Sequence, residues 1–141
     1  MNLNEACKIV GNRYFPGIRN PAGFLESIPN WKPIYQAFPP KNHPGDIDGI
    51  LERHGQFLII EKKQVGATVV PWSGQTRTLK ALHNLGVFTI IYIWGDEANP
   101  QAICVIRPTD EFQINPQPVT YNEWISILKE WWAFAEQHEV Y

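Results

Sequence analysis

The residue types best suited to chemistry lie in the stretch GDIDGILERHGQFLIIEKKQ, from Gly45 to Gln64. Asp48 precedes the first apolar segment of this stretch, and Glu61 and Lys63 end the second. Two carboxylates beside a lysine suit the binding of a divalent cation and the stabilisation of charge on a phosphate. Metal-dependent hydrolysis of a phosphodiester is therefore the chemistry that these residues favour.

A β-hairpin would bring these residues together. The segments 46–52 and 57–63 alternate as strands do, and His54-Gly55 between them tolerates the positive φ angles of a tight turn. If the turn is the two residues His54-Gly55, or the symmetric four-residue loop 53–56, opposed residues have numbers that sum to 109, so Asp48 faces Glu61. Facing like charges are destabilising unless something compensates, and a divalent cation would do so. The alternative is a cross-strand ion cluster on a solvated face.

The ligand types indicate which cation to expect. Carboxylate oxygens on a hairpin suit Mg²⁺ or Mn²⁺, whereas zinc would be expected to bring histidine or cysteine. Lys63 follows Glu61 on the same face, where it would contact the attacking water or the phosphate. Asp46 would face Lys63 in the same register, so it is either a second metal ligand or an ion-pair partner of that lysine.

The remaining elements predict a mixed α/β sheet. Ser73 or Gly74 caps an expected helix from Gln75 to about Asn84 that stops at Gly86, and the apolar run 87–94 predicts a buried central strand. Another strand is expected at 102–107. Thr120 and Glu123 form a capping-box pattern that opens a final helix. Its apolar stripe consists of Trp124, Ile127, Leu128, Trp131 and Ala135.

The first forty residues carry several prolines and glycines that interrupt any long periodic pattern. We expect short helices near Asn4 and over 21–28, and an edge strand over 33–38. The predicted order is therefore α-β-β-β-α-β-β-α in a single domain, residues 1–141.

These residues resemble the PD-(D/E)XK nuclease superfamily, whose hallmark is an acid on one strand and an acid-x-lysine on the next. Asp48 matches the first acid and Glu61-Lys62-Lys63 the second motif. Ser73-Gly74-Gln75, followed by Leu79, Leu82 and Gly86, is similar to the glutamine-bearing helix of the VRR-NUC, Holliday-junction-resolvase-like and RecB-like branches. The likeness covers 45–94, and it departs from the pattern where Gly45 separates Pro44 from Asp46.

The resemblance implies a restriction-endonuclease-like αβββαβ core, here with an added C-terminal helix, and Mg²⁺- or Mn²⁺-dependent cleavage of DNA, whether endonucleolytic or not. It implies that Asp48, Glu61 and the main-chain carbonyl of Lys62 bind the metal. It also implies that Lys63 and Gln75 complete the catalytic set, and that an acid such as Glu5 or Glu26 sometimes contributes. The alternative is a DNA-binding or protein-interaction module that uses the same fold without cutting.

Charge is uneven along the chain. Residues 1–95 hold ten Lys or Arg and six Asp or Glu, whereas residues 96–141 hold two and eight, for a net charge of −2. A basic face can therefore exist beside an acidic tail. Arg77 and Lys80, near the start of the expected glutamine helix, are candidates for phosphate contacts, as is Lys62; a solvated helix face is the alternative for the first two.

Composition bounds the remaining expectations. The chain has 44% hydrophobic residues and no apolar run long enough to span a membrane, so we expect a soluble, cytoplasmic protein. Cys7 and Cys104 match no metal-ligand spacing and are expected to be buried thiols. His54 is expected in the turn and His83 on a helix surface or boundary. Trp132 lies off the main stripe of its helix, which favours self-association. By analogy with small nuclease domains that carry one active site and pair to cut two strands, we expect a homodimer.

Overall fold

The computed structural model describes residues 30–42 and 44–141. The chain divides into two compact units at Gly45. In the first, helix α3 (Lys32–Ala37) replaces the edge strand expected over 33–38, and that prediction was wrong. A proline in the first helical turn suits the φ angle found there, and the Asn30 side chain accepts a hydrogen bond from Lys32 N at 3.1 Å. The helices expected near Asn4 and over 21–28 lie outside the described residues.

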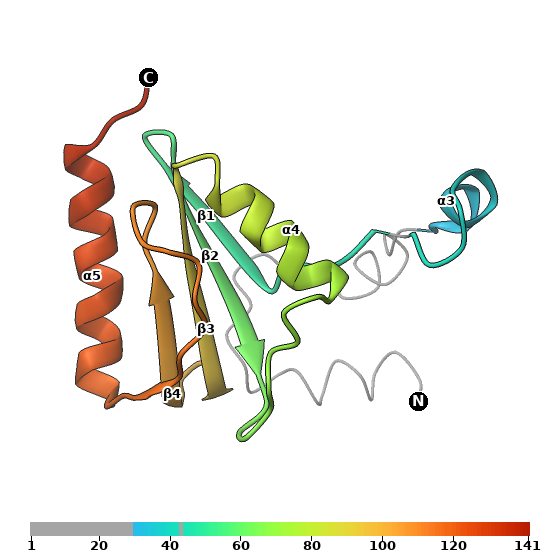
Figure 1. Cartoon of the computed structure of the whole chain (residues 1–141). Helices are drawn as coiled ribbons and strands as arrows, with labels where there is room; N and C mark the ends of the chain where they lie inside the picture. The colour runs from blue at the N-terminus through green and yellow to red at the C-terminus, as the bar shows by residue number, and fades with distance from the viewer. Residues whose placement is uncertain (1–29, 43) are drawn as a thin grey trace, which may run out of the picture. The chain divides into compact units, whose positions relative to one another are not determined.

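The second unit is built on a five-stranded mixed sheet in the order β1-β2-β3-β4-β5 (Figure 1). Strands β2 and β3 are parallel and the other pairs are antiparallel. Helix α4 connects the parallel pair, and α5 follows the sheet. The elements are β1 (Gly49–Arg53), β2 (Gln56–Lys63), α4 (Gly74–His83), β3 (Phe88–Asp96), β4 (Asn99–Ile106), β5 (Gln117–Pro118) and α5 (Tyr121–Gln137).

The mixed α/β sheet is confirmed, but the finer order of the expected core is not. Only β1 and β2 precede α4 in the described residues, because the segment expected to be an earlier strand is α3. Strand β5 was not expected, since its two residues, Gln117 and Pro118, carry no alternating pattern.

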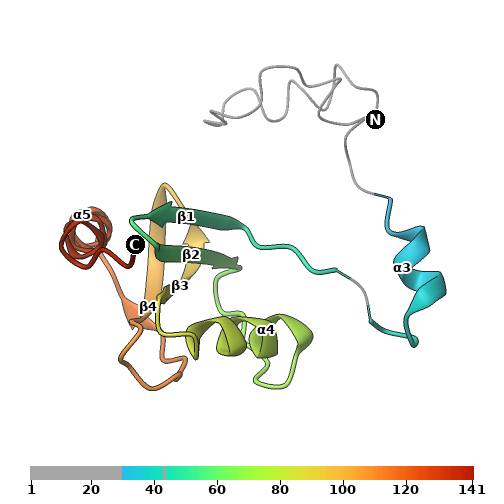
Figure 2. The ribbon, with the colours of Figure 1, turned by 90° about the horizontal axis from the view of Figure 1, so that it is seen from above.

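Helices α4 and α5 cover opposite faces of the sheet (Figures 1 and 2). On one face, Leu79 of α4 packs in a cluster with Ile59, Ile90 and Tyr92. On the other, Trp124, Trp131 and Ala135 of α5 pack in a cluster with strand residues. Strand β3 is buried from Phe88 to Trp94, as expected for a central strand. The sheet thus has two separate apolar layers.

The helix caps follow the sequence prediction. The Ser73 side chain accepts a hydrogen bond from Thr76 N, and Gly86 has a φ of 84° just beyond α4. Thr120 and Glu123 form the predicted capping box of α5. His83 differs from expectation, because it is buried, with its Nε2 hydrogen-bonded to the Arg107 carbonyl at 2.8 Å. Cys104 is a free, buried thiol as predicted, and Cys7 lies outside the described residues.

The hairpin has the predicted register, in which Ile50 pairs with Ile59 and Arg53 with Gln56. His54 and Gly55 form the turn with φ angles of 54° and 83°, as a two-residue turn of this type requires. Strand β1 begins at Gly49, three residues later than expected.

The C-terminal residues contact this turn (Figure 2). Val140 N donates to the His54 carbonyl at 2.9 Å, and the Gln56 side chain donates to the His138 carbonyl at the same distance. The Tyr141 hydroxyl donates to Glu52 at 2.7 Å. The end of the described chain is therefore fastened to the hairpin that carries Asp48 and Glu61.

Candidate active site

Asp48 and Glu61 lie next to each other at the open end of the hairpin. Asp48 immediately precedes β1, and its main-chain N donates to Glu61 Oε1 at 3.2 Å. In return, Asp48 Oδ2 accepts a hydrogen bond from Lys62 N at 2.8 Å. The pairing therefore continues one position past the strand through side chains, and it places the two carboxylates side by side.

Gln75 connects Glu61 to Lys63. Its side-chain Nε2 donates to Glu61 Oε2 at 2.8 Å, and its Oε1 accepts from Lys63 Nζ at 2.7 Å. The amide orientation follows from the network, because a carboxylate only accepts and an ammonium only donates. Gln75 lies in the first turn of α4, where the Ser73 cap positions it over β2. The structure thus brings together Asp48, Glu61, Lys63 and Gln75.

Glu61 is fully buried, with no exposed surface. Burial raises its pKa from 4.5 to about 7, and the neighbouring Asp48 charge adds to that rise. Lys63 and the Asp48 N–H act in the opposite direction. A buried carboxylate that is poised near neutral pH beside a second carboxylate is typical of a functional site.

Tyr92 is a further residue beside Glu61, and the sequence analysis did not identify it. It pairs with Glu61 across the parallel strands β2 and β3 and is fully buried. Burial, and then the Glu61 charge, raises its pKa to about 12. In the described part of the chain its hydroxyl has no hydrogen-bond partner, and the nearby Thr76 hydroxyl donates to the Val70 carbonyl. Only knowledge of the β2–β3 register could have identified this residue.

The charged side chains proposed for DNA contact differ in their surroundings. The Lys62 ammonium pairs with Glu97 at 2.7 Å, whereas the main-chain N of Lys62 donates to Asp48. Arg77 and Lys80 are exposed on α4.

Asp46 is exposed and precedes the hairpin ladder, so the predicted pairing with Lys63 is not formed by strand register. Glu5 and Glu26 lie outside the described residues.

The donor set fits a hard divalent cation with a partly open coordination shell. The adjacent carboxylates of Asp48 and Glu61 offer oxygen ligands, and Mg²⁺ usually retains several waters. Positive charge beside Glu61 would also relieve the cost of ionising that buried side chain. Across residues 30–42 and 44–141, no group of three or more His, Cys, Asp or Glu side chains is arranged to hold a metal ion. Any metal here would therefore take the rest of its ligands from water and substrate.

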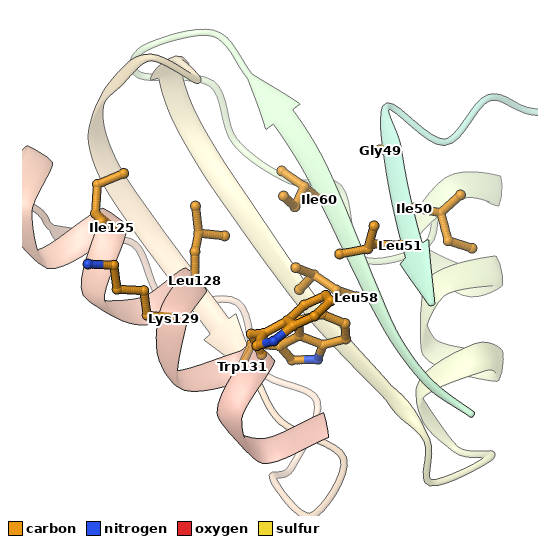
Figure 3. A pocket seen from close by; sticks show the side chains of 10 residues that line it. Gly49, Ile50, Leu51, Leu58, Ile60, Ile125, Leu128, Lys129 and Trp131 are labelled. Atoms are coloured by element: carbon orange, nitrogen blue, oxygen red, sulfur yellow. The ribbon is translucent and has the colours of Figure 1, made fainter. Parts of the chain in front are cut away.

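A groove on the opposite face of the sheet has a different character (Figure 3). This groove of about 510 Å³ lies between the hairpin and α5, where Leu58 of β2 and Trp131 of α5 lie side by side. Its lining is almost entirely apolar, and Lys129 is the charged residue in it. The groove has no acid or nucleophile for catalysis, in contrast to the cluster on the α4 face.

No protein-family model, curated protein or solved structure matches this chain significantly. In the described part of the chain, no helix is both long and apolar enough to cross a bilayer.

Proposed function

We propose that this protein is a metal-dependent nuclease of the PD-(D/E)XK type that hydrolyses phosphodiester bonds in DNA. One observation carries the proposal: Gln75 hydrogen-bonds both Glu61 and Lys63, while Glu61 lies against Asp48. An acid pair, a lysine and a glutamine from three segments of the chain meet here, with the pKa of the buried acid near 7.

Each residue has a definite role in the proposed reaction. Asp48, Glu61 and the Lys62 carbonyl would hold Mg²⁺ or Mn²⁺, which would supply a more acidic water and neutralise phosphate charge. Lys63 orients the attacking water and stabilises the charge that develops on the phosphate. Gln75 holds the Lys63 ammonium in place, since its amide oxygen accepts the lysine hydrogen bond. Exposed Arg77 and Lys80 would contact the DNA backbone.

The test compares two lysines on different faces of the sheet. Lys63→Ala should lower cleavage by roughly 10²- to 10³-fold with Mg²⁺ or Mn²⁺, whereas Lys129→Ala should cut like wild type because Lys129 lies on α5, away from the Asp48–Glu61 pair. Labelled single-stranded, duplex and four-way-junction DNA serve as substrates, and EDTA should stop the reaction. Circular dichroism checks the fold. Equal activity in the two variants would refute the active-site assignment.

The competing proposal is a module that binds DNA without cutting it. Affinity for DNA that survives in EDTA, together with no cleavage under any metal, would favour that alternative. The buried Glu61 carboxyl beside the like-charged Asp48 argues for the nuclease, because a binding surface has no need of such a pair.

We also propose that a second copy of this chain is a partner. Strand β1 is at an edge of the sheet in the described residues, and its Ile50 and Leu51 side chains are 56% and 47% exposed. Trp132 of α5 is 45% exposed and lines the same apolar groove. Exposed edge strands beside apolar surface favour association, and light scattering measures it directly.

A further inference from the structure

Trp72 is the most exposed tryptophan of the chain. Its relative exposure is 77%, compared with 43% for Trp31 and 45% for Trp132, and the other three tryptophans are buried. Trp132 packs its ring against Trp131 and under the Arg53 guanidinium. Within the described residues, Trp72 has no such ring contact. The Trp72 ring is therefore exposed to solvent just before helix α4.

That place adjoins the candidate active site. Trp72 directly precedes Ser73, the cap of α4, and Gln75 follows in the first helical turn. Three residues span at most about 11 Å, which is close to the length of three stacked nucleotides in one strand. A strand whose phosphate lies at Glu61 and Lys63 would therefore bring a neighbouring base within reach of this ring.

The turn that carries Trp72 is anchored. The Val70 carbonyl accepts hydrogen bonds from Ser73 N at 3.2 Å and from the Thr76 hydroxyl at 2.8 Å. The Ser73 and Thr76 hydroxyls are also bonded to each other at 2.9 Å. These bonds hold the turn to helix α4, which positions Gln75. The Trp72 ring and the Gln75 amide are therefore positioned by the same hydrogen-bonded turn.

The charge of this region suits a nucleic acid. The sequence from Gln64 to Gly95 contains no Asp or Glu but includes Arg77 and Lys80, both exposed on α4. The acids resume at Asp96. A nucleic-acid strand that runs from the active site along residues 64–73 and helix α4 would therefore meet no carboxylate from residues 64–95.

We propose that Trp72 stacks on an unpaired base beside the phosphate to be cut, so that the substrate class is nucleic acid with a single-stranded segment at that point. The inference rests on the proposed nuclease function and narrows its substrate. Aromatic side chains stack on bases of any type, whereas the bases inside a duplex have no free face to offer. An exposed apolar ring next to a neutral loop and two cations matches that ligand.

The experiment measures binding and cleavage with the same labelled DNA, as a single strand and as its duplex. In EDTA, Trp72→Ala should bind the single strand roughly 5- to 150-fold more weakly than wild type, while duplex binding stays unchanged. Trp72→Phe should retain most of the affinity because its ring still stacks. Trp31→Ala removes another exposed tryptophan, at the start of α3, and should bind like wild type.

With Mg²⁺ or Mn²⁺, Trp72→Ala should lose cleavage of the single strand in the same proportion. Wild-type affinity in Trp72→Ala, or an equal loss on single strand and duplex, would overturn the stacking inference even if Lys63-dependent cleavage is found. Single-strand binding that depends on Trp72 but is never followed by cleavage would support stacking and refute the nuclease. No binding of wild type to either DNA form would overturn both.

Discussion

The buried Glu61 carboxyl makes the stability of the metal-free protein depend on pH in an unusual direction. Its pKa is about 7 in the folded protein and 4.5 when unperturbed. Between these values the folded state keeps a proton that the unfolded state has lost, so the free energy of unfolding falls as pH rises. Below pH 4.5 the contribution of Glu61 is fully present, and above pH 7 it has been lost.

The magnitude follows from the same two values. A pKa that moves from 4.5 to about 7 corresponds to at most about 3 kcal/mol of stability. Urea denaturation in EDTA at a series of pH values between 5 and 8 measures this loss. Glu61→Gln is the matched variant because its side chain does not ionise, and its unfolding free energy should vary less over the same range. The comparison concerns slopes, since Glu61→Gln also disturbs the hydrogen bond to Gln75.

Divalent cations provide a second arm of the experiment. Mn²⁺ should raise the unfolding free energy of the wild-type protein at pH 8. The increase should be smaller at pH 5, where Glu61 holds a proton. The Glu61→Gln protein should respond weakly at both pH values. Equal pH slopes for wild type and Glu61→Gln would refute the argument that burial perturbs this carboxyl.

Further predictions concern single contacts. Gln75→Ala should destabilise by about 1.5–3 kcal/mol and impair cleavage, because it releases Lys63 and Glu61; unchanged activity would contradict its role. Tyr92→Phe should leave the unfolding free energy unchanged or higher, since its hydroxyl lacks a hydrogen-bond partner among the described residues, and a loss above about 1 kcal/mol would show that the hydroxyl is bonded. Gly55→Ala should cost more than the about 1–2 kcal/mol that a positive φ alone imposes, because the added Cβ would lie 2.7 Å from Val140; Gly66→Ala, at φ 78° in open space, is the control. Leu51→Glu should abolish any dimer that light scattering detects, and a dimer that persists would move the interface elsewhere.

The parts of the site that follow from local pattern were predictable. A symmetric turn, whether the two residues His54-Gly55 or the four residues 53–56, gives the observed register, and that register places Asp48 beside Glu61. Ser73 likewise caps the helix that carries Gln75. These features depend on residues close together in the sequence, so no tertiary information was needed to expect them.

The remainder depends on contacts that the sequence does not encode locally. Tyr92 reaches Glu61 through the parallel pairing of β2 and β3, whose register is not set by a turn. The segment over 33–38 is too short for its apolar pattern to distinguish strand from helix, so α3 was mistaken for a strand. His83 is buried through a bond to Arg107, far along the chain.

The parallel crossover between β2 and β3 has a consequence for how the protein folds. The hairpin is a local structure that can form within about 1–10 μs, while Glu61 is still hydrated and ionised at neutral pH. Its burial requires β3 and α4 to assemble around it, which depends on pairing distant segments. Closure of the sheet near pH 6 should therefore be accompanied by uptake of a proton, so that a pH indicator in a stopped-flow experiment would report when the crossover is complete.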